Sequence, residues 1–331
     1  MASKICHSMT LSGRKRRMRT SLFSGPALVV ALLTGCATPP KRASAPSPRH
    51  VLEAVHTWQL NLPNGERFDS SGLFLGPNGD LLTVSDRGPS VYWIQFRANT
   101  NAADLVKVPD CFTPEQLVGL PAGASGRYDC EGIAGDELGR IYLCEEGHRW
   151  ILRWDPNSRR VERLEIDWAP VQRYFSKLDP NASFEGIAIG GGRLYVANER
   201  DQGRIIVVDL ARLEIVDDFE VRSSVASFWG PHYSDLCWFD GDLYVLMRED
   251  HVILRVDPRL HRVLAEFDFR AIEFAAENRY HRLYPFVGIM EGLAVDRDRF
   301  WLVTDNNGLG RERYPTDTRP TLFLCPRPDR R

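Results

Sequence analysis

An internal repeat constrains this sequence more than any other feature. Five segments of 17 or 18 residues align with one another, each with a short apolar run, a turn of Gly, Asp or Asn, and a second apolar run. We number these segments repeat one to repeat five; they begin at Ser71, Glu131, Glu185, Ser234 and Glu291, with spacings of 60, 54, 49 and 57 residues. Two apolar runs around such a turn are typical of a β-hairpin, so the hairpin itself is the repeating unit.

Further strand-like runs follow each hairpin. A third run follows all five hairpins and a fourth follows the first four, whereas repeat five lacks its fourth run. An unassigned strand-like run, Val51–Leu60, precedes repeat one. Four-stranded units that recur about every 40 to 50 residues are typical of β-propellers. We therefore predict an all-β, five-bladed β-propeller that Val51–Leu60 closes by completing the last blade; a sixth blade would have to be hidden in an insert.

The residues before the repeats have the pattern of an export signal. A basic stretch, Arg14–Arg19, precedes an apolar run from Pro26 to Leu33, which is followed by Thr34-Gly35-Cys36. A basic region, a short apolar region and small residues before the cut are typical of a signal peptide. The residues Leu33-Thr34-Gly35-Cys36 resemble a bacterial lipobox, in which Cys36 is acylated. An ordinary signal peptide with an incidental cysteine is the alternative.

This pattern divides the chain into three parts. We expect residues 1–36 to be a lipoprotein signal peptide, residues 37–50 a flexible tether rich in Pro, Ala and Ser, and residues 51–331 one propeller domain. A lipid anchor at Cys36, followed by Ala37 rather than Asp, predicts attachment to the membrane of the bacterial envelope, at the outer membrane and facing the periplasm. The net charge of −2 does not favour a nucleic-acid partner. Export permits disulfides, and Cys111 and Cys130, which flank one loop, are the candidate pair.

Acidic residues recur at two positions of the repeat. In a propeller blade the first strand lines the central channel, and its start lies beside the end of the antiparallel second strand. Both positions therefore meet at one mouth of the channel. The first-strand starts are Ser71, Glu131, Glu185, Ser234 and Glu291, and the second-strand ends are Asp86, Glu146, Glu199, Arg248 and Asp305.

Seven of these ten positions are acidic. Crowded carboxylates repel one another unless their pKa values rise or a cation binds. Because oxygen ligands suit Ca²⁺ and no His or Cys cluster has zinc spacing, we predict a Ca²⁺ site at this mouth. The alternative is that the acids close turns within each blade. Repeat four has Ser234 and Arg248 instead of acids, which favours an off-axis metal site among the other repeats.

Other polar residues map near the same mouth and are candidates for ligand binding. They are Arg87, Arg200, Arg248, His232 and Tyr233. Arginines beside a metal suit a phosphate or carboxylate group, but ion pairs with the acids explain them equally well. The sequence has no Gly-x-Ser-x-Gly motif and no identifiable nucleophile near His232, so hydrolysis would need a metal-activated water or a metal-polarised ester oxygen.

The order of these motifs resembles that of the SdiA-regulated family of bacterial envelope propellers. Ser85–Pro89 and Phe184–Ala188 are also similar to motifs of the related family called esterase-like activity of phytase. The resemblance spans about Ser70 to Leu324 and implies a five-bladed, calcium-associated propeller. Carried onto this sequence, it implies metal ligands among the seven acids: Glu131, Glu185, Glu291, Asp86, Glu146, Glu199 and Asp305. Repeat four lacks the acid at both matched positions, which departs from a symmetric site.

Three functions are compatible with these residues. The first is a calcium-associated envelope lipoprotein that binds a small, anionic ligand at its carboxylate-lined mouth. The second is a metal-dependent phosphomonoesterase or esterase that resembles phytase. The third is a scaffold that contacts other envelope proteins. The first two differ in whether a coordination position of the metal stays open to water and substrate.

Overall fold

A computed structural model describes residues 47–120, 128–179, 182–225, 230–281 and 288–329. The chain divides into two compact units, residues 1–44 and residues 45–331, and every described residue belongs to the second. Strands dominate the described residues, which also include one short α-helix, α1 (Arg270–Glu273), and one 3₁₀ helix, η1 (Ala169–Tyr174). Within these ranges, the helices are all too short or too polar to span a bilayer. Cys36, the predicted lipid-anchor residue, lies outside the described residues.

The strands follow the repeats along the chain. Before the repeats come β1 (Arg49–Val51) and β2 (His56–Asn61). The strands of the repeats are β3 (Ser70–Leu75), β4 (Leu81–Ser85), β5 (Gly88–Phe96), β6 (Ala102–Lys107), β7 (Cys130–Gly135), β8 (Ile141–Glu145), β9 (Trp150–Asp155), β10 (Arg160–Arg163), β11 (Phe184–Gly190), β12 (Arg193–Asn198), β13 (Arg204–Asp209), β14 (Glu214–Phe219), β15 (Asp235–Phe239), β16 (Asp242–Met247), β17 (Val252–Asp257), β18 (Arg262–Asp268), β19 (Met290–Val295), β20 (Arg299–Thr304) and β21 (Thr321–Pro326).

These strands form four hydrogen-bonded sheets. Two sheets have four strands each, β7 to β10 and β11 to β14, and a third has β15 to β18 with β1 added at its outer edge. The fourth has eight strands in the order β19-β20-β21-β2-β6-β5-β4-β3. The first two strands of every repeat pair antiparallel, as the hairpin pattern predicts.

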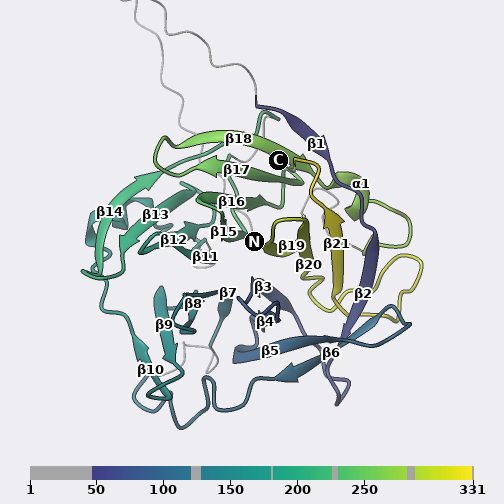
Figure 1. Ribbon diagram of the computed structural model, residues 1–331, viewed down its shortest axis with the longest axis horizontal. Coiled ribbons are helices and arrows are strands. Elements are labelled where there is room, and N and C mark those ends of the chain that lie inside the picture. The colour runs from purple at the N-terminus through teal and green to yellow at the C-terminus, as the bar shows by residue number, and fades with distance from the viewer. Residues whose placement is uncertain (1–46, 121–127, 180–181, 226–229, 282–287, 330–331) are drawn as a thin grey trace, which may run out of the picture. The chain divides into compact units, whose positions relative to one another are not determined.

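The first strands of the repeats lie innermost. Contacts between them run in a closed cycle, from β3 to β7, β11, β15, β19 and back to β3. Figure 1 shows the sheets extending outward from these inner strands. The middle strands read as nearly continuous apolar runs, such as Leu243–Met247 in β16, because both of their faces are buried between neighbouring sheets.

The two N-terminal strands lie away from the inner first strands (Figure 1), β1 at the edge of its sheet and β2 between β21 and β6. β2 pairs antiparallel with β21, where His56 lies opposite Leu324, and parallel with β6. The expected partnership between the run before repeat one and the last strand is thus observed. β1 pairs parallel with β18 and includes Arg49 and His50, which the sequence placed in the tether. Arg49 is held there by ion pairs of 2.8 Å with Glu266 and 2.7 Å with Asp268.

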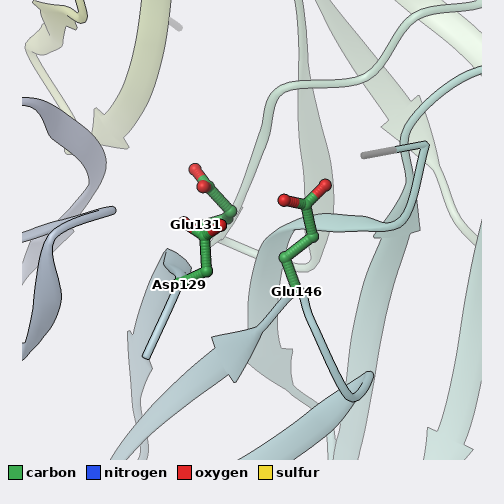
Figure 2. A group of neighbouring side chains, drawn as sticks. All are labelled: Asp129, Glu131 and Glu146. Carbon is green, nitrogen blue, oxygen red and sulfur yellow. The ribbon is translucent and has the colours of Figure 1, made fainter. Parts of the chain in front are cut away.

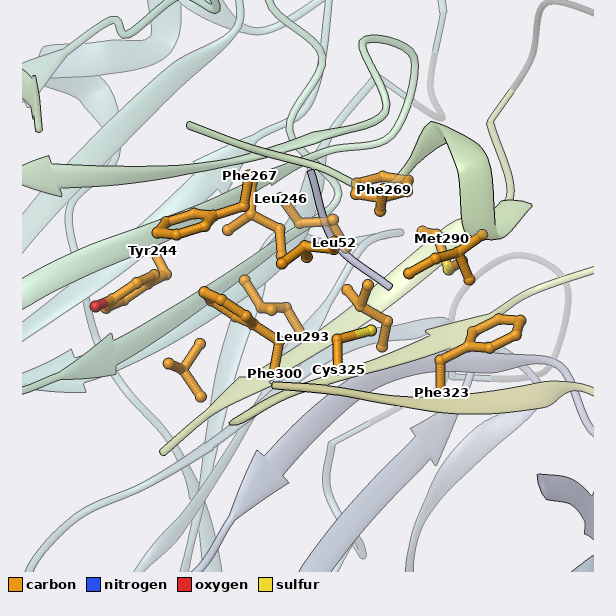
Figure 3. Close-up of a cluster of buried hydrophobic side chains, with 14 of the residues drawn as sticks. Leu52, Tyr244, Leu246, Phe267, Phe269, Met290, Leu293, Phe300, Phe323 and Cys325 are labelled. Carbon is orange, nitrogen blue, oxygen red and sulfur yellow. The ribbon is translucent and has the colours of Figure 1, made fainter. Parts of the chain in front are cut away.

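Apolar clusters fill the spaces between neighbouring sheets. The cluster in Figure 3 joins β16 to β18 with β19 to β21, and the rings of Phe267 and Phe300 lie 4.7 Å apart in it. Another cluster contains both Cys111 and Cys130, which are free thiols, so the predicted disulfide between them is wrong. Both side chains are fully buried among apolar neighbours, where a cysteine packs as a small apolar side chain, and burial raises the pKa of Cys111 to about 12.

Candidate functional site

The first-strand acids occupy β-bulges. The pairing registers of β7–β8, β11–β12 and β19–β20 shift at Glu131, Glu185 and Glu291, so one extra residue stands opposite the second strand at each point. Ser71 occupies the same position in repeat one, whereas the hairpin of repeat four pairs without a shift. A bulge leaves its extra residue outside the hydrogen-bond ladder and redirects its side chain.

The second-strand ends meet these bulges, as the repeat predicts. Asp86, Glu146, Glu199 and Asp305 directly follow β4, β8, β12 and β20, and Arg248 follows β16. In repeats two, three and five the backbone N–H of the second-strand acid donates to the residue two positions before the bulge: Glu146 to Asp129 (2.8 Å), Glu199 to Ser183 (2.8 Å) and Asp305 to Ile289 (2.9 Å). We call the region formed by these ten positions the carboxylate mouth.

Repeat two brings three carboxylates together. Asp129, Glu131 and Glu146 each offer one oxygen, and these oxygens lie within 4.8 Å of one another. Figure 2 shows the three side chains gathered at one end of β7 and β8. Glu146 is only 7% exposed, and its Oε1 atom is buried without a hydrogen-bond partner. An orphaned buried carboxylate oxygen beside two further acids is chemically suited to a cation.

Asp129 was missed by the sequence analysis. It lies two residues before Glu131, outside the aligned hairpin, and Asp69 holds the same position before Ser71 in repeat one. That recurrence is a signal that would have found both residues. Asp69 is fully buried and forms ion pairs with Arg67 (2.7 Å) and Arg87 (3.4 Å). Arg87, a predicted ligand contact, is therefore engaged by a neighbouring acid.

Burial and mutual repulsion raise the pKa values of the acids at this mouth. Burial first, then Glu185 and Asp129, raises the pKa of Glu146 to about 9. The same causes raise the pKa of Glu131 well above its ordinary value. Burial raises the pKa of Glu185 to about 7, although Arg248 and Arg200 oppose the shift. Burial is the largest cause of all three shifts, and the neighbouring carboxylates add to it for Glu131 and Glu146.

Repeats one and five show a weaker form of the same effect. Burial and then the charge of Asp69 raise the pKa of Asp86 to about 6 and that of Asp305 to about 7. Asp305 also accepts a hydrogen bond of 2.7 Å from the backbone N–H of Asn307, which opposes the shift. These two acids are not part of the three-oxygen group of repeat two.

Repeat four places a cation among the remaining acids. The guanidinium of Arg248 forms ion pairs with Glu291, with Glu199 (2.8 Å) and with Glu249 (3.4 Å). His232 contacts Glu199 through Nε2 and Glu249 through Nδ1, the latter at 3.3 Å. Burial and the nearby Arg248 hold the pKa of His232 well below its ordinary value, so the ring is neutral at pH 7.

Two other predicted ligand contacts are occupied within the protein. Arg200 forms ion pairs with Glu199 and, at 2.9 Å, with Asp179. Tyr233 is fully buried in an apolar cluster, and its hydroxyl donates to the carbonyl of Val221 (2.8 Å) and accepts from the N–H of the same residue (3.0 Å). Tyr233 therefore stabilises the fold, and its hydroxyl does not face the mouth.

Comparisons with known proteins agree with this fold. The chain resembles a glutaminyl cyclase from Myxococcus xanthus at 13% identity and a TM-score of 0.55, covering 85% of this chain and 100% of that one. A virginiamycin B lyase from Staphylococcus aureus matches at 14% identity and a TM-score of 0.40, covering 76% of this chain and 68% of that one. A PQQ-bound aldose sugar dehydrogenase from Streptomyces coelicolor matches at 13% identity and a TM-score of 0.43, covering 83% and 98%. The agreement in fold rests on the glutaminyl cyclase, a β-propeller protein.

At the level of sequence, no curated protein matches the chain. A family model, phytase-like: esterase-like activity of phytase, matches residues 69–308. The matched segment begins at the buried Asp69, ends just after Asp305 and contains all seven predicted acids together with Asp129 and Arg248. With most of its length inside that match, including every residue of the carboxylate mouth, the chain belongs to the phytase-like family.

Proposed function

We propose that this protein is a five-bladed, calcium-binding β-propeller that takes a small anionic ligand at its carboxylate mouth. The observation that carries the proposal is the buried, unpartnered Oε1 of Glu146 beside the oxygens of Asp129 and Glu131. The closed cycle of contacts among the five inner strands supports the blade count. An envelope location with a lipid anchor at Cys36 is part of the same proposal and rests on the export pattern.

Calcium is the cation that best suits this group of acids. Ca²⁺ accepts six to eight oxygen ligands in flexible geometry, whereas zinc prefers nitrogen and sulfur ligands. Three carboxylates from one repeat leave coordination positions for water, for Glu185 or for an oxygen of a ligand. A bound cation would also replace the protons that the raised pKa values of Glu131 and Glu146 retain. The site is off-axis because its acids come from repeat two.

One arginine, Arg149, favours an anionic ligand next to the cation. The charges of Arg200 and Arg149 both act on Glu146, and Arg149 carries a buried Nε atom without a hydrogen-bond partner. The guanidinium carbon of Arg149 lies 4.6 Å from the ring centroid of Phe175. A phosphate or carboxylate group that bridges a metal and an arginine gains charge-assisted hydrogen bonds. Arg149 was not among the residues predicted from sequence.

Calorimetry of the purified protein tests the metal site. Ca²⁺ at about 100 times its dissociation constant would stabilise the fold by about 2.7 kcal/mol, and a chelator would reverse the shift. Glu146→Gln should reduce the affinity at least tenfold because it removes one charged ligand. The exposed Glu53→Gln is the matched control and should retain the full shift. A melting temperature that neither Ca²⁺ nor chelator moves would refute the site.

A metal-dependent ester hydrolase is the second candidate, and family membership favours it. In that case the open metal position would hold the attacking water or polarise the ester oxygen. A panel of phosphate and carboxylate esters, assayed with Ca²⁺ and with chelator, separates the two functions. Turnover that needs Ca²⁺ and disappears in Glu146→Gln would establish the enzyme, and binding without turnover would establish the ligand-binding protein.

A further inference from the structure

Below the carboxylate mouth the inner strands approach one another too closely for most side chains. The position after each first-strand start is occupied by Gly72, Gly132, Gly186, Asp235 and Gly292. A Cβ atom on Gly186 would lie 2.4 Å from the Cα atom of Asp235, and one on Gly132 would lie 2.8 Å from the carbonyl oxygen of Glu185. Repeats two and three therefore need glycine here, and we call this ring of five residues the throat.

Asp235 is the exception in the throat, and its carboxylate crosses between strands. It accepts the backbone N–H of Leu293 in β19 at 2.7 Å and of Leu73 in β3 at 3.4 Å, as well as its neighbour Leu236 at 2.8 Å. β3 is not adjacent to β15 in the cycle of inner strands, so the carboxylate spans the space between them. Asp235 is fully buried. It therefore separates the carboxylate mouth from whatever lies beyond the throat.

A cavity lies beyond the throat, at the end of the inner strands away from the carboxylates. It has about 240 Å³ of free space and is lined by residues of all five inner strands. Leu73, Ile133, Ile187 and Leu236 line it, and each directly follows a throat residue. The cavity and the carboxylate mouth therefore lie on opposite sides of the same ring.

Aromatic rings form part of the cavity wall, and glycines make room for them. A Cβ atom on Gly135 would lie 2.4 Å from the ring of Phe74, and one on Gly190 would lie 2.1 Å from the ring of Trp238. Both rings line the cavity, each lying against a glycine of the following or preceding repeat.

The described lining residues offer no unpaired charge. Asp296 is the charged residue among them, and its carboxylate accepts the backbone N–H of Asp298 (2.7 Å) and the Nε–H of Arg299 (2.9 Å). An ionised group that moves into the cavity would lose part of its hydration without gaining an oppositely charged partner, at a cost on the order of a few kcal/mol. An uncharged group would instead gain from burying apolar surface.

We propose that this cavity is a second ligand site, independent of the carboxylate mouth, for an uncharged small molecule with one aromatic ring. Its size supports this class, because an apolar protein cavity of about 150 Å³ binds benzene. A substituted single ring fits the larger space here. Since Asp235 closes the throat, the ligand enters from the far end and does not reach the carboxylates.

Titration with toluene, followed by Trp fluorescence and by the melting temperature, tests the site. Toluene should bind saturably, whereas benzoate, which has the same ring with a negative charge, should not bind in the cavity. Ala188→Leu adds a side chain to the cavity lining and should weaken toluene binding at least tenfold. Cys237→Leu fills the same cavity from another strand and serves if the first variant does not fold.

The two sites should respond separately. Ala188→Leu should retain the Ca²⁺-induced shift in melting temperature, and Glu146→Gln should retain toluene binding. Absence of saturable toluene binding would overturn the proposal, as would equal binding of benzoate or unchanged affinity in a folded cavity-filling variant. None of these results depends on whether the carboxylate mouth binds calcium.

Discussion

Repeats two and four use the same position of the fold in opposite ways. Glu146 ends the second strand of repeat two and faces Asp129 and Glu131, with one of its oxygens unpartnered. Arg248 ends the second strand of repeat four and pairs with acids from repeats three and five. Repeat four therefore neutralises its neighbours from within the chain, whereas the three acids of repeat two form a group that could hold a metal ion.

Removal of the cation of repeat four should have the largest effect. Arg248→Met leaves Glu199, Glu249 and Glu291 without their shared guanidinium, whose side chain is only 15% exposed. Loss of one partner of a buried ion pair costs about 3–5 kcal/mol of unfolding free energy. Denaturant unfolding measures this loss. Arg259→Gln, at a site 89% exposed, should change the stability by less than about 0.5 kcal/mol.

Calcium sharpens this prediction. If uncompensated charge is what attracts the cation, Arg248→Met should be rescued in part by added Ca²⁺, because the variant makes the third, fourth and fifth repeats resemble repeat two. A variant that stays as stable as the natural protein would show that the acids around Arg248 need no cation. The contrast between the two repeats would then be one of geometry rather than charge.

The pH dependence of the metal-free protein should be the next largest effect. Folding raises the pKa of Glu146 to about 9 and that of Glu185 to about 7, so the folded state holds protons that the unfolded chain has released. The unfolding free energy should therefore fall as pH rises from about 4.5 toward 9. Saturating Ca²⁺ should reduce this fall, because it stabilises the ionised carboxylates.

Unfolding curves at pH 5.5 and pH 8, with Ca²⁺ and with chelator, measure this dependence. Glu146→Gln should flatten the metal-free curve because it removes the acid with the pKa of about 9. Glu53→Gln should leave the slope unchanged. A metal-free protein that becomes more stable toward pH 8 would contradict the assignment of repeat two as the uncompensated region.

Substitution in repeat one should have the smallest effect. Asp86 lies at the position of Glu146 but outside the three-oxygen group, and the ion pairs of Asp69 with Arg67 and Arg87 lie close to it. Asp86→Asn should lower the calcium affinity by less than about threefold, within roughly 0.7 kcal/mol. Calcium titration of this variant beside Glu146→Gln ranks the two repeats. An equal loss in both would extend the site to repeat one.

The sequence was most informative about features that are local. The alternation of apolar runs and turns predicts the hairpins, because each hairpin forms between residues close in the chain. Antiparallel pairing then brings Glu131 near Glu146, and this too follows from one hairpin. The β-bulges that hold Glu131, Glu185 and Glu291 leave no pattern of their own, since one extra residue does not interrupt the apolar run.

Features that join different repeats escaped prediction. The sequence shows that Arg248 stands where the other four repeats have an acid at the end of the second strand. Its ion pairs with Glu199 and Glu291, however, depend on how repeats three, four and five pack against one another. The cysteine pair was assigned from loop position alone, and the apolar cluster around both thiols decided otherwise. Asp129 was overlooked because it precedes the hairpin, although its carbonyl is tied to Glu146.

The placement of β1 and β2 also decides how the domain responds to force. A pull on the chain before Arg49 loads the short β1–β18 pairing first. It then loads β2, which pairs with both β21 and β6. β18 and β6 are each three strands away from the inner strand of their repeat, and β21 is two strands away from β19. Force applied through the preceding residues would thus act first on these outer strands. The carboxylate mouth would keep its structure until β1 and β2 had separated from their partners.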